Sequence, residues 1–156
     1  MNNVQSLYWI VPELMLTVAA LIILAGSMFN RSRHFIASIA GVSVLAGGWI
    51  LLKTCASGGS LFFGLLQDDL YSGFFRLVIL LAALILIPVS LACAELKGED
   101  SGEFFFFLLF LTATMMLAAI SSHLLMVYIT IEAISIMSYV MAGYLKRDIF
   151  SSESGM

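Results

Sequence analysis

One acidic residue lies near the middle of a long apolar stretch. Glu132 is the only acid between Leu124 and Leu145, a run long enough to cross a bilayer as a helix of about 20 residues. A charge at that depth costs roughly 2.5–3.5 kcal/mol on insertion scales. Acids in such positions commonly bind and release protons along an ion path. Glu132 is therefore the first candidate for proton translocation.

The helical neighbours of Glu132 are polar. At about 100° per residue, the residues within about 60° of it are Tyr128, Ser135, Tyr139 and Gly143. The opposite face carries Met126, Ile134, Met137 and Met141. Glu132 and its polar neighbours form a polar stripe along this helix. The polar stripe should face protein or a water-filled cavity rather than lipid. The hydroxyl groups of Tyr128, Ser135 and Tyr139 can relay or solvate a proton, whereas the methionine face is expected to pack.

Burial and a nearby cation shift the pKa of a carboxyl in opposite directions. An acid held between these effects can load and release a proton near neutral pH. The alternative is a structural acid that is hydrogen-bonded to a neighbouring helix. All seven cations of the chain lie in loops or at the ends of predicted spans. A counter-charge for Glu132 must therefore come from outside these 156 residues.

His123 is the other titratable candidate. It directly precedes the helix that carries Glu132, so a capping or interfacial role competes with proton transfer. His34 is expected at the opposite membrane face from His123, and no metal site is predicted. No pattern indicates catalytic residues or a cofactor-binding site on this chain.

The elements that carry these residues are those of a membrane protein. Hydrophobic residues make up 62% of the 156 residues and charged residues 11%, compared with about 25% charged residues in soluble domains. We therefore predict an all-α fold, a polytopic transmembrane helix bundle in contact with the lipid bilayer. The net charge of −3 is small and no stretch is strongly basic, so no nucleic-acid partner is expected.

Five membrane spans are predicted from the apolar runs. They cover approximately residues 10–29, 35–52, 74–93, 103–120 and 124–145. With the N-terminus outside, five cations fall inside and two, Lys53 and Arg76, fall outside at helix edges. Trp9, Trp49 and Tyr71 then lie near the outer interface, where amphipathic rings prefer to sit.

Local signals refine these elements. Glu13 would lie at the positive end of the first helix dipole, and this role is favoured over a functional one. Asp69 can cap the third helix. The segment Leu61–Leu66 is apolar but too short to span, so it is expected at the interface or against other helices. Only Ser121–His123 separates the last two spans, which predicts a tight antiparallel hairpin.

Several stretches match one known family in the same order. The most specific is Ile131–Ser135 followed by Ser138 and Tyr139. The others are Val11–Leu14, Asp69–Phe75, Gly102–Phe105 and Ser152–Met156. Together they resemble the antiporter-like subunits of NADH-quinone oxidoreductase (respiratory complex I), and most closely the subunit N family. The resemblance covers essentially the whole chain.

This resemblance implies a larger machine. Such subunits have about fourteen helices, built as two inverted units of about five helices each. Glu132 matches the family's helix-five glutamate, which pairs with a lysine on a broken helix seven to gate a proton half-channel. That lysine has no counterpart before Met156. The chain is therefore expected to correspond to the N-terminal third of such a subunit.

The resemblance also implies a role. It is that of a membrane-arm subunit in the bacterial inner (plasma) membrane, assembled with other membrane subunits. The whole complex couples electron transfer from NADH to quinone to proton movement, and this subunit itself would carry no cofactor. Two alternatives stay open. One is a subunit of a multisubunit sodium/proton antiporter, and the other is a non-functional or purely structural fragment.

Overall fold

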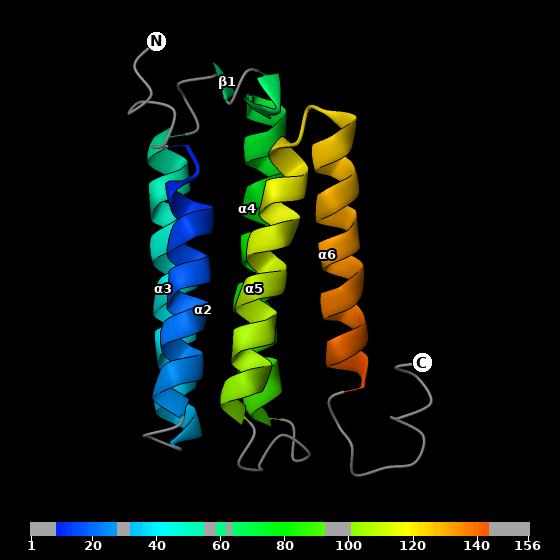
Figure 1. The fold of residues 1–156 in the computed structure, drawn as a ribbon. Coiled ribbons are helices and arrows are strands. Elements are labelled where there is room, and N and C mark those ends of the chain that lie inside the picture. Colours follow the sequence, from blue (N-terminus) through cyan, green and yellow to red (C-terminus); the bar gives the residue numbers. More distant parts are fainter. Residues whose placement is uncertain (1–8, 28–31, 55–58, 62–63, 93–100, 144–156) are drawn as a thin grey trace.

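The computed structural model describes residues 9–27, 32–54, 59–61, 64–92 and 101–143. Within this part the predicted all-α class is confirmed, because five helices run roughly along one common direction (Figure 1). They are α2 (Val11–Ser27), α3 (Arg33–Thr54), α4 (Leu70–Ala92), α5 (Ser101–Ile120) and α6 (Leu124–Ala142). By length and composition α3, α4, α5 and α6 can each cross a membrane, whereas α2 is a shorter apolar helix of 17 residues.

The helices differ from the predicted spans mainly at their beginnings. α3 begins two residues before the expected Phe35, and α5 begins two residues before the expected Glu103. α4 begins at Leu70 rather than Phe74, because Tyr71, Ser72 and Gly73 add little to the hydropathy of the span. The last expected residues of the first, third and fifth spans lie outside the described part of the chain.

A reciprocal cap explains where α4 begins. The Ser72 backbone N–H donates to Asp69 Oδ1 at 2.7 Å, and the Asp69 N–H donates to the Ser72 hydroxyl at 3.0 Å. Two N–H groups that the helix itself leaves free are thereby satisfied. The predicted capping role of Asp69 is confirmed.

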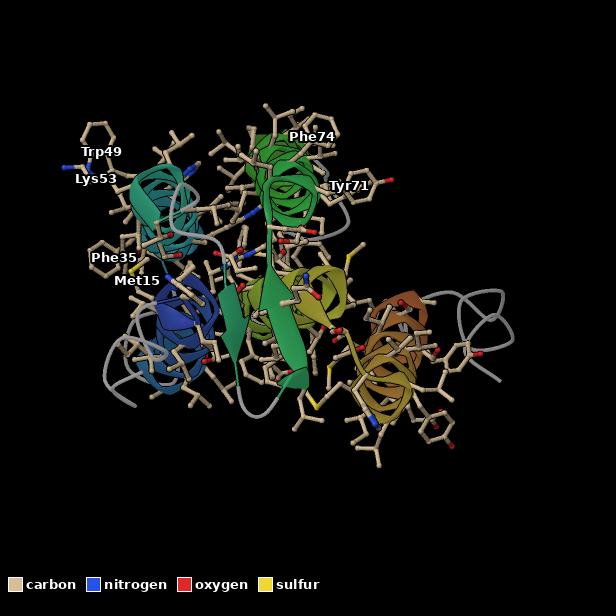
Figure 2. All side chains as sticks on the ribbon, turned by 90° about the horizontal axis from the view of Figure 1, so that it is seen from above. Met15, Phe35, Trp49, Lys53, Tyr71 and Phe74 are labelled. Carbon is tan, nitrogen blue, oxygen red and sulfur yellow. The ribbon has the colours of Figure 1, made fainter. Side chains whose placement is uncertain are left out.

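The apolar core lies between α2, α3, α4 and α5. α2 packs on α3 and α5, and α4 packs on the same two helices. The most deeply buried core side chains include Leu16, Ala20, Ile23, Val44, Leu51, Leu109, Ala113 and Met116. α6 lies at the side of this group and packs mainly on α5 (Figures 1 and 2).

Glycines permit close approach at two places in this core. A Cβ added at Gly47 of α3 would lie 3.9 Å from the Leu16 side chain of α2, an ordinary contact distance. A Cβ added at Gly102, near the beginning of α5, would overlap the Cβ of Ser27 at the end of α2. The backbone of α5 therefore lies directly against the end of α2.

A short β-hairpin precedes α4. Strands β1 (Gly59–Leu61) and β2 (Leu66–Asp68) pair antiparallel, with Ser60 opposite Gln67. Gly64, between the strands, has a φ of 88°, a conformation that favours glycine. The predicted continuous apolar segment Leu61–Leu66 is thus divided by a turn. The expectation that it lies against helices is confirmed at Leu66, which is buried with Ile10 and Ile120.

The hairpin is hydrogen-bonded to the turn between α5 and α6. Leu66 forms an isolated β-bridge with Ser121. The Leu65 carbonyl accepts the N–H groups of Ser122 at 3.0 Å and His123 at 3.3 Å. α5 and α6 form the tight antiparallel pair that was predicted, and β2 is hydrogen-bonded to their connection.

Three aromatic residues lie at this same end of the bundle. Trp9 precedes α2, Trp49 is near the end of α3, and Tyr71 is in the first turn of α4. The Trp49 and Tyr71 rings point away from the bundle (Figure 2) and are mostly exposed. Their predicted clustering at one end is confirmed, and their contact with a membrane interface stays a prediction.

Candidate functional site

His123 positions the beginning of α6. Its backbone is extended, and its ring Nδ1 accepts the Leu125 N–H at 3.3 Å. This is a helix N-cap, in which a side-chain acceptor satisfies an N–H of the first turn. The expected capping role is confirmed, and a part in proton transfer stays a prediction.

The two faces of α6 have different environments. On the side toward α5, Thr130 is buried, and Met126, Met137 and Met141 are half-buried. Met141 packs against the main core. The prediction that the methionine face packs is therefore confirmed.

The polar stripe is on the open side of α6. Tyr128 is 68% exposed, Tyr139 is 64% exposed, and Glu132 is also exposed. Ser135 is half-buried, and its hydroxyl donates to the Ile131 carbonyl of its own helix at 2.9 Å. Among the described residues, none forms a hydrogen bond or ion pair with the Glu132 carboxylate. The polar stripe was expected to face protein or a water-filled cavity, but none of the described helices of this chain packs against it.

A second group of charges is buried at the end of the bundle where α2 and α4 begin. The sequence predicts Arg76 as an outer cation at the edge of its span; that this end faces the outside stays a prediction, but Arg76 does not lie at an exposed edge. It lies in the second turn of α4 and is 0% exposed. The reason is that the buried face of α4 extends through the first turns, with members at Ser72, Gly73, Arg76, Leu80, Ala83, Ile87 and Ser90. Because Arg76 is at helical spacing from the apolar residues Leu80, Ala83 and Ile87, the sequence itself indicates that Arg76 faces inward.

The Arg76 guanidinium joins three segments. Its Nη1 lies 3.0 Å from Asp68 Oδ1 of β2. Its Nη2 lies 2.6 Å from Glu13 Oε1 of α2 and donates to the Trp9 carbonyl at 2.9 Å. The planar fork of arginine suits such convergent contacts. We call Glu13, Asp68 and Arg76 the buried charge cluster.

Glu13 has a larger role than the dipole interpretation gave it. It is in the first turn of α2, as that interpretation requires. However, its side chain is only 1% exposed and is ion-paired with Arg76. The dipole placement is confirmed, and the ion pair is an additional contact that a helix wheel does not reveal, because the wheel contains no information about a partner on a distant helix.

Asp68 experiences opposing influences within the cluster. Burial raises the pKa of its carboxyl above the ordinary value, while the charge of Arg76 and hydrogen bonds from Ser72 and Arg76 act to lower that pKa. Burial is the largest effect, so the net direction is upward. The cluster can therefore stabilise the packing of α2, β2 and α4, and its net charge can change with pH.

The sequence is similar over nearly its full length to named respiratory proteins. It is 35% identical over 167 aligned residues to NADH-quinone oxidoreductase subunit N 2 of Sorangium cellulosum, covering 100% of this chain and 33% of that protein. It is 29% identical to NADH-quinone oxidoreductase subunit N of Anaeromyxobacter sp., covering 99% and 31%. It is 33% identical to NAD(P)H-quinone oxidoreductase subunit 2 of Acaryochloris marina, covering 94% and 29%. No protein-family model matches the chain.

These similarities cover a limited share of each relative. The chain spans about a third of the length of the curated relatives it matches. Its four apolar helices of spanning length, together with these relatives, identify a multi-pass membrane protein. The resemblance found in the sequence motifs is confirmed by the names of the relatives.

Proposed function

We propose that this chain, a homologue of the N-terminal third of NADH-quinone oxidoreductase subunit N, works as a membrane-arm subunit of such an oxidoreductase. In this role it contributes to proton translocation coupled to electron transfer from NADH to quinone. The subunit is non-redox: NADH and quinone react elsewhere in the complex. Its partners are other membrane subunits, and its location is the bacterial inner membrane. The names of the relatives favour this function over a sodium/proton antiporter.

The polar stripe of α6 is the observation that carries the proposal. One side of α6 packs on α5, and the side with Glu132, Tyr128 and Tyr139 is left uncovered. A carboxylate on a membrane helix needs protein or water around it. A second set of helices carrying a cation would satisfy that requirement. Glu132 then takes up and releases the proton, and Tyr128, Ser135 and Tyr139 solvate or relay it.

The test is Glu132→Gln in the assembled complex, with protons translocated per NADH oxidised as the readout. We expect this ratio to fall, because glutamine keeps the size of the side chain and removes its proton-binding carboxylate. Glu103→Gln is the matched control, since Glu103 is an exposed acid in the first turn of α5. We expect the control to pump as the wild type does. An unchanged ratio in Glu132→Gln would exclude Glu132 from the required path.

A further inference from the structure

The buried charge cluster does not balance its own charge. It contains two carboxylates, Glu13 and Asp68, and one guanidinium, Arg76, which sum to −1 when all are ionised. The three side chains are 1%, 2% and 0% exposed respectively. Burying an uncompensated charge is costly, and such groups tend to change protonation state instead. One additional proton would make the cluster neutral.

In the part of the chain that the structure describes, no second cation supplies the missing positive charge. Among the described residues, Arg76 is the only cation in ion-pair contact with either carboxylate. Asp69, beside the cluster, is acidic and adds to the negative potential at Asp68. Lys53 is exposed and lies over the Trp49 ring, 5.3 Å from its centroid. Two further titratable residues are described at this end and both are exposed: Tyr71 in the first turn of α4, and His123, which caps α6.

The free acceptor atoms indicate where a proton can bind. Arg76 contacts one oxygen of each carboxylate, Glu13 Oε1 and Asp68 Oδ1. The second oxygens, Glu13 Oε2 and Asp68 Oδ2, are buried and have no hydrogen-bond partner among the described residues. Glu13 Oε1 has an ion-pair contact with Arg76 but likewise no hydrogen bond in the described part. A buried acceptor without a partner carries a penalty of about 1–3 kcal/mol, more if it is charged. Protonation of one of these oxygens would remove the excess charge while leaving both contacts with Arg76 in place.

We propose that Glu13 and Asp68 form a proton-binding site that holds one proton while Arg76 stays charged. The step is simple: a proton from water adds to a carboxylate oxygen, and the net charge of the cluster changes from −1 to zero. The site is separate from Glu132, which lies on α6, and it does not depend on the proposed function. A change in its protonation can affect the position of α6, because Leu66 of β2 forms a β-bridge with Ser121 and the preceding Leu65 carbonyl accepts the N–H groups of Ser122 and His123.

The experiment compares the wild type with Glu13→Gln and Asp68→Asn, using the full chain together with the subunits that co-purify with it. Thermal unfolding is followed between about pH 5 and pH 9. The folded wild type binds the proton more tightly than the unfolded chain does. This contribution to stability is therefore present at low pH. It is lost as the pH rises through the pKa that the site has in the folded state. We expect the folding equilibrium constant to fall by up to about tenfold per pH unit across that interval.

Each single variant leaves one carboxylate with one guanidinium, which is already neutral. We therefore expect the pH slope to disappear in Glu13→Gln and in Asp68→Asn. Glu103→Gln is the control, because Glu103 is an exposed acid in the first turn of α5 and has no contact with the cluster; it should keep the wild-type slope. An identical slope in the wild type and both cluster variants would overturn the proposal.

A second measurement does not require the cluster variants to fold. Infrared spectra of the preparation carrying Glu132→Gln, which removes the acid in the middle of α6, report the C=O stretch of protonated carboxylic acids. We expect this band at neutral pH and its loss at high pH. Absence of the band at neutral pH would mean that both carboxylates are ionised, and the proposal would then be wrong.

Discussion

Replacing Arg76 with methionine tests whether the buried charge cluster holds the end of the bundle together. Methionine is unbranched and flexible, so it fills much of the same space without the charge. The change removes the ion pairs to Glu13 and Asp68 and the hydrogen bond to the Trp9 carbonyl. Breaking a buried pair by removing one partner costs about 3–5 kcal/mol. The unfolding equilibrium should therefore shift toward the unfolded state by about a hundredfold or more.

The assay is thermal and denaturant unfolding of the chain in detergent micelles, followed by circular dichroism. Lys53→Met is the matched control, because Lys53 is an exposed cation at the same end of the bundle. Its contact with the Trp49 ring is worth about 0.5–1 kcal/mol. Equal stability of Arg76→Met and Lys53→Met would refute the reasoning.

The effect of Arg76→Met should also depend on pH. Arg76 acts to lower the pKa of Asp68 from its ordinary value of 3.8, and burial acts to raise it. Without the cation, the folded-state pKa of this carboxyl is higher still. A group whose folded-state pKa is raised contributes stability that is present below the unfolded value and is lost as pH rises through the folded value. The destabilisation relative to the wild type should therefore be smaller at acidic pH than at alkaline pH.

Three further substitutions test packing, capping and the open face of α6. Gly102→Ala should destabilise the folded chain by about 1–3 kcal/mol, because the added Cβ would overlap Ser27. Gly41→Ala is the control, because a Cβ added there meets no atom within 4 Å. It should be neutral or stabilising in the same unfolding assay. Asp69→Ala should cost about 0.5–2 kcal/mol through loss of the α4 cap, and Asp69→Asn should restore most of that stability. Glu132→Gln should leave the free energy of unfolding of the isolated chain within about 0.5 kcal/mol of the wild type, since exposed side chains contribute little. A large loss of stability would show that Glu132 has a structural partner in this chain.

The helices and the two faces of α6 are predictable from the pattern of residues along the chain. Long apolar runs separated by polar segments can satisfy their backbone groups only as helices in a membrane, so five helices were predictable. The opposition of Glu132 and the methionine face follows from the helical period alone. The caps at Asp69 and His123 depend on residues a few positions away, and such local interactions can be read from sequence.

The environments of the charged residues depend on tertiary packing and are not predictable from local patterns. Glu13, Asp68 and Arg76 belong to different elements, and their ion pairs exist because packing places the beginnings of α2 and α4 beside β2. No periodic pattern contains that distance, so Glu13 was interpreted as a dipole partner and Arg76 as an edge cation. The β-hairpin was missed for a related reason, since its strands are three residues long and depend on tertiary contacts with Ser121 and Ser122. Local periodicity fixes which side of a helix a residue occupies, but the burial and partners of that side depend on how distant segments pack together.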